Sequence, residues 1–134
     1  MLAEQKLTDA DYLLLFDVVF FEPYTHNTTG DASLSQQYAL KVVIPYIDSC
    51  RKHIAKTNPA VCKYGEAGWY LVQNKPEKAI TDLLYLTRIY PHPTVFKALG
   101  DYYTRVGDAQ KAQTYFMKSL ISSADTYENA GIFS

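Results

Sequence analysis

The sequence predicts an all-α protein, and three features of the chain agree on this fold class. Apolar residues recur at intervals near ~3.6 residues, the spacing of one face of an α-helix. No segment alternates apolar and polar residues as a half-buried strand does. Proline, glycine and asparagine divide the chain into helix-sized pieces. We expect about six helices in a single structural domain, since 134 residues suit one compact unit.

The first predicted helix begins at Thr8. Asp9 and Asp11 follow it, and their negative charges suit the positive end of a helix dipole. The helix is expected to end near Phe21, because Pro23 disfavours helical geometry in the residue before it. Its second half is apolar on nearly all sides.

Two further helices follow a polar loop. The second is expected from Ser33 or Ser35 to about Lys56, with a kink or break at Pro45, which lacks an N–H group for the helical hydrogen bond. Asn58 is a predicted N-cap for the third helix, which runs to about Gln73. Residues 1–58 therefore hold a leading pair of helices.

Residues that break helices separate the last three helices. The breaks contain Asn74 and Pro76, Pro91 and Pro93, and Gly107 and Asp108. The sixth helix is expected to end near Ser122, and residues 125–134 are expected to form a C-terminal tail.

The second half of the chain contains an internal repeat, in which Asn74–Ala79 aligns with Gly107–Ala112, 33 residues later. The segment 93–121 resembles a tetratricopeptide repeat (TPR) on these residues: Phe96 in the place of the motif's Trp, Leu99, Gly100, Tyr103, Gly107, Asp108, Ala112 and Phe116. The segment 59–92 keeps Ala67, Tyr70, Asn74, Ala79, Leu83 and Pro91, but has Lys63 and Glu66 where the motif has Trp and Leu.

The resemblance to TPR proteins implies a right-handed α-solenoid of antiparallel helix pairs. Small residues at Ala67, Ala79, Gly100 and Ala112 would let neighbouring helices approach closely. Residues 59–124 would form two TPR-like hairpins. The leading pair in 1–58 would be a divergent cap, since about three units are needed to bury a solenoid core. An unrelated six-helix bundle is the alternative.

Charge and hydropathy argue against two classes of partner. The chain has 13 Lys and Arg against 14 Asp and Glu, so it lacks the basic surplus typical of nucleic-acid-binding proteins. The most apolar run, Tyr12 to Phe21, is much shorter than the ~20 residues that span a membrane. We expect neither nucleic-acid binding nor membrane insertion.

The sequence predicts no enzyme activity and no cofactor. It contains no glycine-rich phosphate loop, no nucleophile elbow, and no carboxylate placed with a histidine as a catalytic pair. His26, His53 and His92 lack the paired spacing of metal ligands. Cys50, His53 and Cys62 would leave a zinc ion one ligand short, so no metal site is expected.

Cys50 and Cys62 fall at similar heights on the two sides of the predicted turn between the second and third helices. They are expected either to form a disulfide or to remain two buried thiols. A disulfide would indicate a periplasmic or secreted protein, and free thiols a cytoplasmic one, so the localisation stays open.

The TPR resemblance also implies a concave groove lined by the first helix of each unit. By position, its residues are Val61, Tyr64, Gly68, Leu71, Val72, Thr94, Lys97, Asp101, Thr104 and Arg105. Gly68 and Asp101 occupy places where a clamp for peptide carboxylates has Asn, which argues against such a clamp. The chain has 12 tyrosines, and six are not explained by the repeat, namely Tyr12, Tyr24, Tyr46, Tyr64, Tyr102 and Tyr127. They predict a tyrosine-rich binding face.

These features predict a non-catalytic module that binds a protein or peptide through the groove or the tyrosine-rich face. One alternative is a self-assembling structural subunit that associates through Leu13–Phe21. Another is an accessory in secretion or appendage assembly, similar to repeat-containing chaperones and pilotins.

Overall fold

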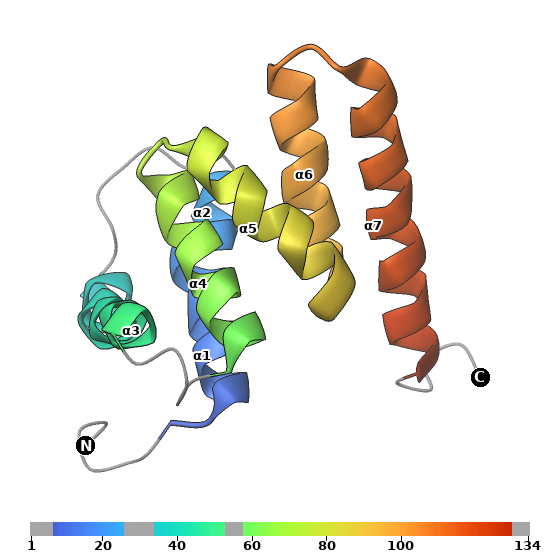
Figure 1. Ribbon diagram of the computed structural model, residues 1–134. Helices are drawn as coiled ribbons and strands as arrows, with labels where there is room; N and C mark the ends of the chain where they lie inside the picture. Colours follow the sequence, from blue (N-terminus) through green and yellow to red (C-terminus); the bar gives the residue numbers. More distant parts are fainter. Residues whose placement is uncertain (1–6, 26–33, 53–57, 130–134) are drawn as a thin grey trace. The chain divides into compact units, whose positions relative to one another are not determined.

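The computed structural model describes residues 7–25, 34–52 and 58–129, and this part of the chain is all-α, as predicted (Figure 1). Neighbouring helices pack antiparallel in six helical segments. The segments are Asp9–Thr25, made of α1 (Asp9–Phe16), η2 (Asp17–Phe21) and α2 (Glu22–Thr25), then α3 (Leu34–Lys52), α4 (Pro59–Val72), α5 (Pro76–Ile89), α6 (Pro93–Arg105) and α7 (Ala109–Asn129). They belong to two compact units, Met1–Ala79 and Ile80–Ser134, which divide within α5.

The predicted helix starts at Thr8 and Asn58 are confirmed by their capping hydrogen bonds. The Thr8 hydroxyl accepts a bond from the Asp11 N–H (3.2 Å), and the Asp11 carboxylate accepts one from the Thr8 N–H (2.9 Å). The Asn58 side-chain carbonyl accepts a bond from the Ala60 N–H (3.0 Å) and caps α4. These bonds satisfy backbone donors that have no partner within the helix.

The predicted end of the first helix near Phe21 is wrong. The helix changes to a π-helical turn in η2 and continues through Pro23 to Thr25. In an α-helix, Phe21 would lie about 140° around the axis from Phe16, because each residue turns the chain by about 100°. The wider π turn brings both phenylalanines to the side that contacts α4, and Pro23 follows where the α-helical hydrogen bonding is already interrupted.

Two other details of the predicted helices can be compared with the structure. Of the kink or break predicted at Pro45, the structure has no break, because α3 runs through this residue. α7 continues beyond Ser122 to Asn129, into residues predicted to form the C-terminal tail. No glycine or proline lies between Ser122 and Asn129, so nothing in this stretch interrupts the helix. The predicted end of the second helix at Lys56 lies outside the described residues.

In the first unit, the core forms where the Asp9–Thr25 helix packs against α4. Phe16 lies over Gly65, where an added Cβ would come within 2.6 Å of the ring. Phe20 lies over Gly68, where an added Cβ would come within 2.8 Å of the Phe20 Cβ. The absence of a side chain at these two helix positions therefore allows the close approach of the helices.

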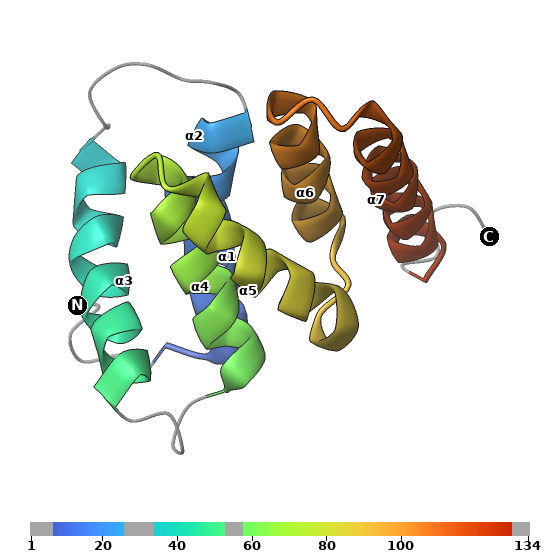
Figure 2. The same cartoon turned by 45° about the horizontal axis from the view of Figure 1, so that its top comes forward.

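In the second unit, α6 and α7 form an antiparallel hairpin and lie side by side in both views (Figures 1 and 2). Phe116 of α7 lies over Gly100 of α6, where an added Cβ would come within 2.6 Å of the ring. Phe96 is buried, which agrees with its predicted core position. The Ser119 hydroxyl donates a hydrogen bond to the Pro93 carbonyl (3.0 Å) at the other end of the hairpin.

The α4–α5 and α6–α7 junctions have the same turn. Asn74 and Gly107 both adopt positive φ, 60° and 86°, as the residue that ends a helix often does. The matching hydrogen bonds run from the Lys75 N–H to the Tyr70 carbonyl and from the Asp108 N–H to the Tyr103 carbonyl, each 2.9 Å. Both junctions are therefore Schellman motifs.

The similarity of the junctions includes side chains. The Lys78 Nζ lies 5.8 Å from the centre of the Tyr70 ring, and the Lys111 Nζ lies 5.3 Å from that of Tyr103. In each case a lysine after the turn covers a tyrosine before it, in a cation–π arrangement. The 33-residue alignment therefore holds across the turns.

We predict that Gly68→Ala destabilises the protein, although alanine is the better helix former. The methyl group would meet the Phe20 Cβ, which cannot move without its backbone, so the free energy of unfolding should fall by about 1 to 3 kcal/mol. Urea denaturation followed by circular dichroism measures the change. Thr81→Ala, at an exposed position of α5, is the control and should cause no loss. A Gly68→Ala variant more stable than the wild type would contradict this account of the packing.

Candidate functional site

The α4 half of the predicted groove is part of the protein core. Tyr64 is only 1% exposed, and its hydroxyl donates a hydrogen bond to the Asp17 carboxylate of η2. Gly68 lies under Phe20, and Val61 and Leu71 are buried. The prediction that these four residues line a groove is therefore wrong, because the Asp9–Thr25 helix already occupies that face of α4. Of the predicted residues on α4, Val72 is exposed.

The misplacement has a simple geometric cause. Tyr64 and Gly68 are buried with the same spacing as Phe96 and Gly100. The interval between these two pairs is one residue shorter than the interval between the turns at Asn74 and Gly107. When the two hairpins are aligned on their turns, each position of α6 is matched to a residue of α4 that is one position out of register, or about 100° around the helix. Buried residues of α4 are then assigned to positions that are exposed in α6.

The α6 half of the predicted groove is at the surface. Lys97, Thr104 and Arg105 are exposed, whereas Thr94 and Asp101 are half-buried. Lys97, Asp101 and Arg105 follow one another at intervals of one helical turn. Burial raises the pKa of the Asp101 carboxyl above its usual value, although the positive charges of Lys97 and Arg105 act to lower that pKa. α6 thus presents a polar, mainly basic strip.

A hollow of about 420 Å³ lies beside this strip, between the C-terminal part of α6 and the first half of α7. Its lining residues are Thr104, Gly107, Ala109, Ala112, Gln113, Phe116 and Met117. Gly107, Ala109 and Ala112 have little or no side chain, which leaves space beside the Phe116 ring. Thr104 belongs to both the strip and the hollow, so polar and apolar surfaces meet there.

The apolar surface extends from the hollow along α7. Met117, Leu120 and Ile121 are 52%, 67% and 58% exposed. Their spacing places them on adjoining positions of one helix face. We call these three residues the α7 stripe. Single exposed apolar residues are common on proteins, but a group of three beside an apolar hollow is typical of a binding surface.

The tyrosines of the predicted binding face are divided between the two units. Tyr12, Tyr24, Tyr46 and Tyr64 lie in the first unit and Tyr102 in the second, while the Tyr127 side chain lies outside the description. Tyr12 stacks on Tyr46 with ring centres 3.9 Å apart, and Tyr102 meets Tyr103 edge-on at 5.2 Å. Burial raises the pKa of the Tyr46 hydroxyl, and the charge of Asp9 adds to this increase.

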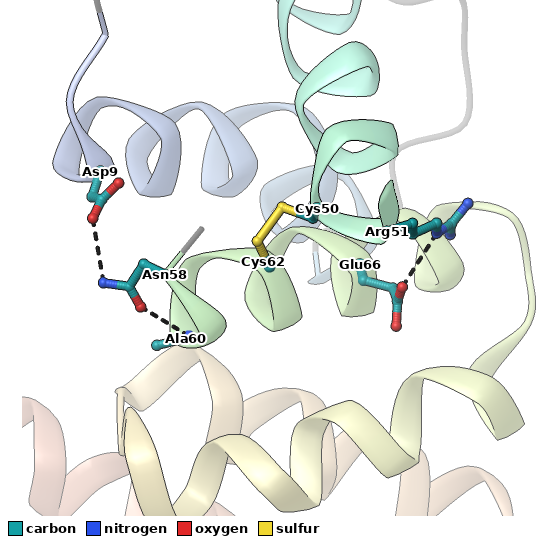
Figure 3. The surroundings of a disulfide bond; sticks show 7 residues. All are labelled: Asp9, Cys50, Arg51, Asn58, Ala60, Cys62 and Glu66. Atoms are coloured by element: carbon teal, nitrogen blue, oxygen red, sulfur yellow. Dashed lines mark hydrogen bonds and ion pairs between the residues drawn. A yellow bond between two sulfur atoms is a disulfide. The ribbon is translucent and has the colours of Figure 1, made fainter. Parts of the chain in front are cut away.

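The two cysteines are joined by a disulfide that links α3 to α4 (Figure 3). Their Cα atoms lie 5.8 Å apart, within the usual range for a disulfide. One residue further along α3, Arg51 forms an ion pair with Glu66 of α4, with 3.3 Å between Nε and Oε2 (Figure 3). The Asn58 side-chain amide also donates a hydrogen bond to the Asp9 carboxylate (3.3 Å), which joins the starts of α4 and α1.

Of the three histidines, His92 lies in the part of the chain that the structure describes. The His92 Nδ1 accepts a hydrogen bond from the Thr94 N–H (3.2 Å) and so caps α6. His26 and His53 lie outside the described residues. Among residues 7–25, 34–52 and 58–129, no three His, Cys, Asp or Glu side chains gather as metal ligands. None of the described helices combines the length and apolar character of a membrane-spanning helix.

No protein-family model, curated protein or solved structure matches the chain. The site is therefore defined by the geometry of the α6–α7 hairpin. The α6 residues of the predicted groove are at the surface, whereas the hollow and the α7 stripe were not predicted from the sequence. The available signals were the small residues Gly107, Ala109 and Ala112, and the apolar residues of α7 that the repeat motif does not use.

We predict that the Cys50–Cys62 disulfide contributes about 3 kcal/mol to the free energy of unfolding, the entropic value for closing a loop of this size. Urea denaturation of the wild type with and without dithiothreitol measures the contribution. The double variant Cys50→Ser and Cys62→Ser should be as unstable as the reduced wild type and should not respond to the reductant. A wild type with the same urea midpoint in both states would show that the bond is not formed or not stabilising.

Proposed function

We propose that the protein is a non-catalytic helical module that binds a segment of a partner protein on the α6–α7 hairpin. The observation that carries the proposal is the hollow beside Phe116, with the α7 stripe on one side and the polar strip on the other. An apolar depression with a few polar groups at its edge is the usual form of a ligand site. At about 420 Å³, it has room for one or two apolar side chains of a bound segment.

A TPR-like arrangement of the last two hairpins is part of the proposal. The matching turns at Asn74 and Gly107 support it, as do the cation–π contacts on Tyr70 and Tyr103. The packing of Phe116 on Gly100 gives further support, because both residues occupy positions of the repeat motif. The proposed ligand surface is the α6–α7 hairpin alone, without the buried residues of α4.

An oxidising compartment is the setting that the disulfide favours, since reducing conditions in the cytosol keep most thiols free. A periplasmic or secreted location agrees with the alternative considered from the sequence, an accessory in secretion or appendage assembly. In such a role the module would hold a segment of another protein without altering it chemically.

Self-association through the first helix is a second candidate function. Leu14 is 64% exposed and Val18 is also exposed, one helical turn away. Phe16, Phe20 and Phe21 of the same helix are buried in the core of the first unit. The apolar surface available to a second copy is therefore narrower than the sequence predicts.

If the α6–α7 hairpin is the binding site, peptides selected from a random displayed library for binding to the intact protein should bind at the hollow. Met117→Glu places a charge at its wall and should weaken the selected peptides by about ten-fold or more. Thr81→Glu, at an exposed position of α5, is the matched control and should not change their affinity. Fluorescence anisotropy measures both. Selected peptides that bind the Met117→Glu variant as tightly as the wild type would place the site elsewhere.

Self-association predicts a mass above the monomer's 15.2 kDa in light scattering at micromolar concentration. Leu14→Lys should return the mass to that of the monomer, because a charge cannot be buried between two apolar helices without large cost. A wild type that stays monomeric over the whole concentration range would eliminate this candidate.

A further inference from the structure

We infer that Tyr12 of α1 and Tyr46 of α3 form a site of oxidative modification, at which a haem peroxidase and hydrogen peroxide join the two rings as a dityrosine. The cross-link is a second covalent tie in the first unit, in addition to the Cys50–Cys62 disulfide. The site lies in the first unit and is independent of the proposed binding on the α6–α7 hairpin.

The two tyrosine rings face each other closely. Their centres lie 3.9 Å apart, and their planes are inclined by 24°. Aromatic pairs in proteins usually have ring centres ~4.5 to 7 Å apart. Two other tyrosine pairs fall in that range, Tyr103–Tyr115 at 5.6 Å and Tyr102–Tyr103 at 5.2 Å. Carbon atoms of Tyr12 and Tyr46 are therefore in van der Waals contact, so a small movement suffices to form a bond between them.

The surrounding structure holds this pair in place. The buried Phe16 ring lies beside both tyrosines, with its centre 6.3 Å from that of Tyr12 and 6.0 Å from that of Tyr46. One helical turn after Tyr46, the disulfide at Cys50 ties α3 to α4. Two groups held side by side react as if each were present at very high concentration. Coupling within one chain is therefore favoured over coupling between two chains.

The hydroxyl groups of the pair favour coupling at the right atoms. Burial raises the pKa of the Tyr46 hydroxyl, and the charges of Asp9 and Tyr12 add to this increase. The effect of Tyr12 indicates that the two hydroxyl groups lie near each other. In a dityrosine the new bond joins the ring carbons next to the hydroxyl groups, so these carbons are near each other as well. Both side chains are only half-buried, which leaves them accessible to an oxidant.

The reaction balances with hydrogen peroxide as the oxidant. Each tyrosine gives one electron to the peroxidase and loses its phenolic proton, which leaves two phenoxyl radicals. The radicals form one bond between ring carbons. Each of these carbons then loses its hydrogen as a proton, and each oxygen regains one. The two electrons and two protons released overall convert one hydrogen peroxide to two water molecules. An oxidising compartment, the setting that the disulfide favours, is compatible with this chemistry.

The test treats the intact protein with a haem peroxidase and hydrogen peroxide and maps the products by mass spectrometry. After reduction of the disulfide, trypsin releases Tyr12 in residues 7–41 and Tyr46 in residues 42–51. These two peptides should be joined with the loss of two hydrogen atoms, and fragmentation should place the bond at Tyr12. The joined fraction should not change on dilution, because the bond forms within one chain.

The stacked pair Tyr103–Tyr115 is an internal control in the second unit. Trypsin releases its members in residues 98–105 and 112–118. This pair should be joined at least about ten-fold less often, because its wider spacing lowers the effective concentration of one ring at the other. Tyr46→Phe keeps a ring in the stack without a phenol and should abolish the cross-link to Tyr12. Tyr115→Phe should leave that cross-link unchanged.

The cross-link should also hold α1 to α3 after the disulfide has been reduced. In dithiothreitol, the cross-linked monomer should therefore unfold at a higher urea concentration than the untreated protein, because a covalent tie restricts the unfolded chain. Peroxidase treatment of Tyr46→Phe should not raise its urea midpoint, which controls for oxidation at other residues.

Two results would overturn the modification site. One is a Tyr12–Tyr46 cross-link no more frequent than that between Tyr103 and Tyr115, and the other is a cross-link that disappears on dilution. An equal urea midpoint with and without the cross-link would overturn its role as a second tie.

Discussion

The packing of a phenylalanine ring against a helix glycine is the interaction on which the rest of the structure depends. It occurs in the first unit at Gly65 and Gly68 and in the second unit at Gly100. At each position a methyl group would approach the facing phenylalanine closer than 3.0 Å. The missing side chain therefore sets the distance between the two helices, and the aromatic ring fills the space that remains between them.

This shared packing leaves the two units with different surfaces. In the first unit, the helix Asp9–Thr25 covers the glycine face of α4, and the π turn at η2 adds Phe21 to that contact. Tyr64 and Gly68 are consequently unavailable to a ligand. In the second unit, Phe116 covers Gly100 from one side, and α7 keeps Leu120 and Ile121 exposed on the other. The surface that we propose for a partner segment is therefore on the second unit.

Local chemistry was predictable from the sequence, but the pairing of helix faces was not. Caps at Thr8 and Asn58 depend on hydrogen bonds within a few residues, and the sequence identified them correctly. The buried face of α4 depends on the distance between a glycine and a turn, which differs by one residue between the hairpins. The π turn at η2 was missed because it depends on contact with α4, and the hollow because small residues leave space only when two helices face each other.

The two units also differ in what stabilises them, and this difference bears on the proposed binding. In the first unit, the Cys50–Cys62 disulfide and the Arg51–Glu66 ion pair connect α3 to α4. In the second, α6 and α7 are held by side-chain packing and the hydrogen bond from Ser119. A partner segment bound on the α7 stripe would bury apolar area on the unit without a covalent link. Because a ligand of the folded state stabilises that state, the proposed partner would stabilise this hairpin most directly.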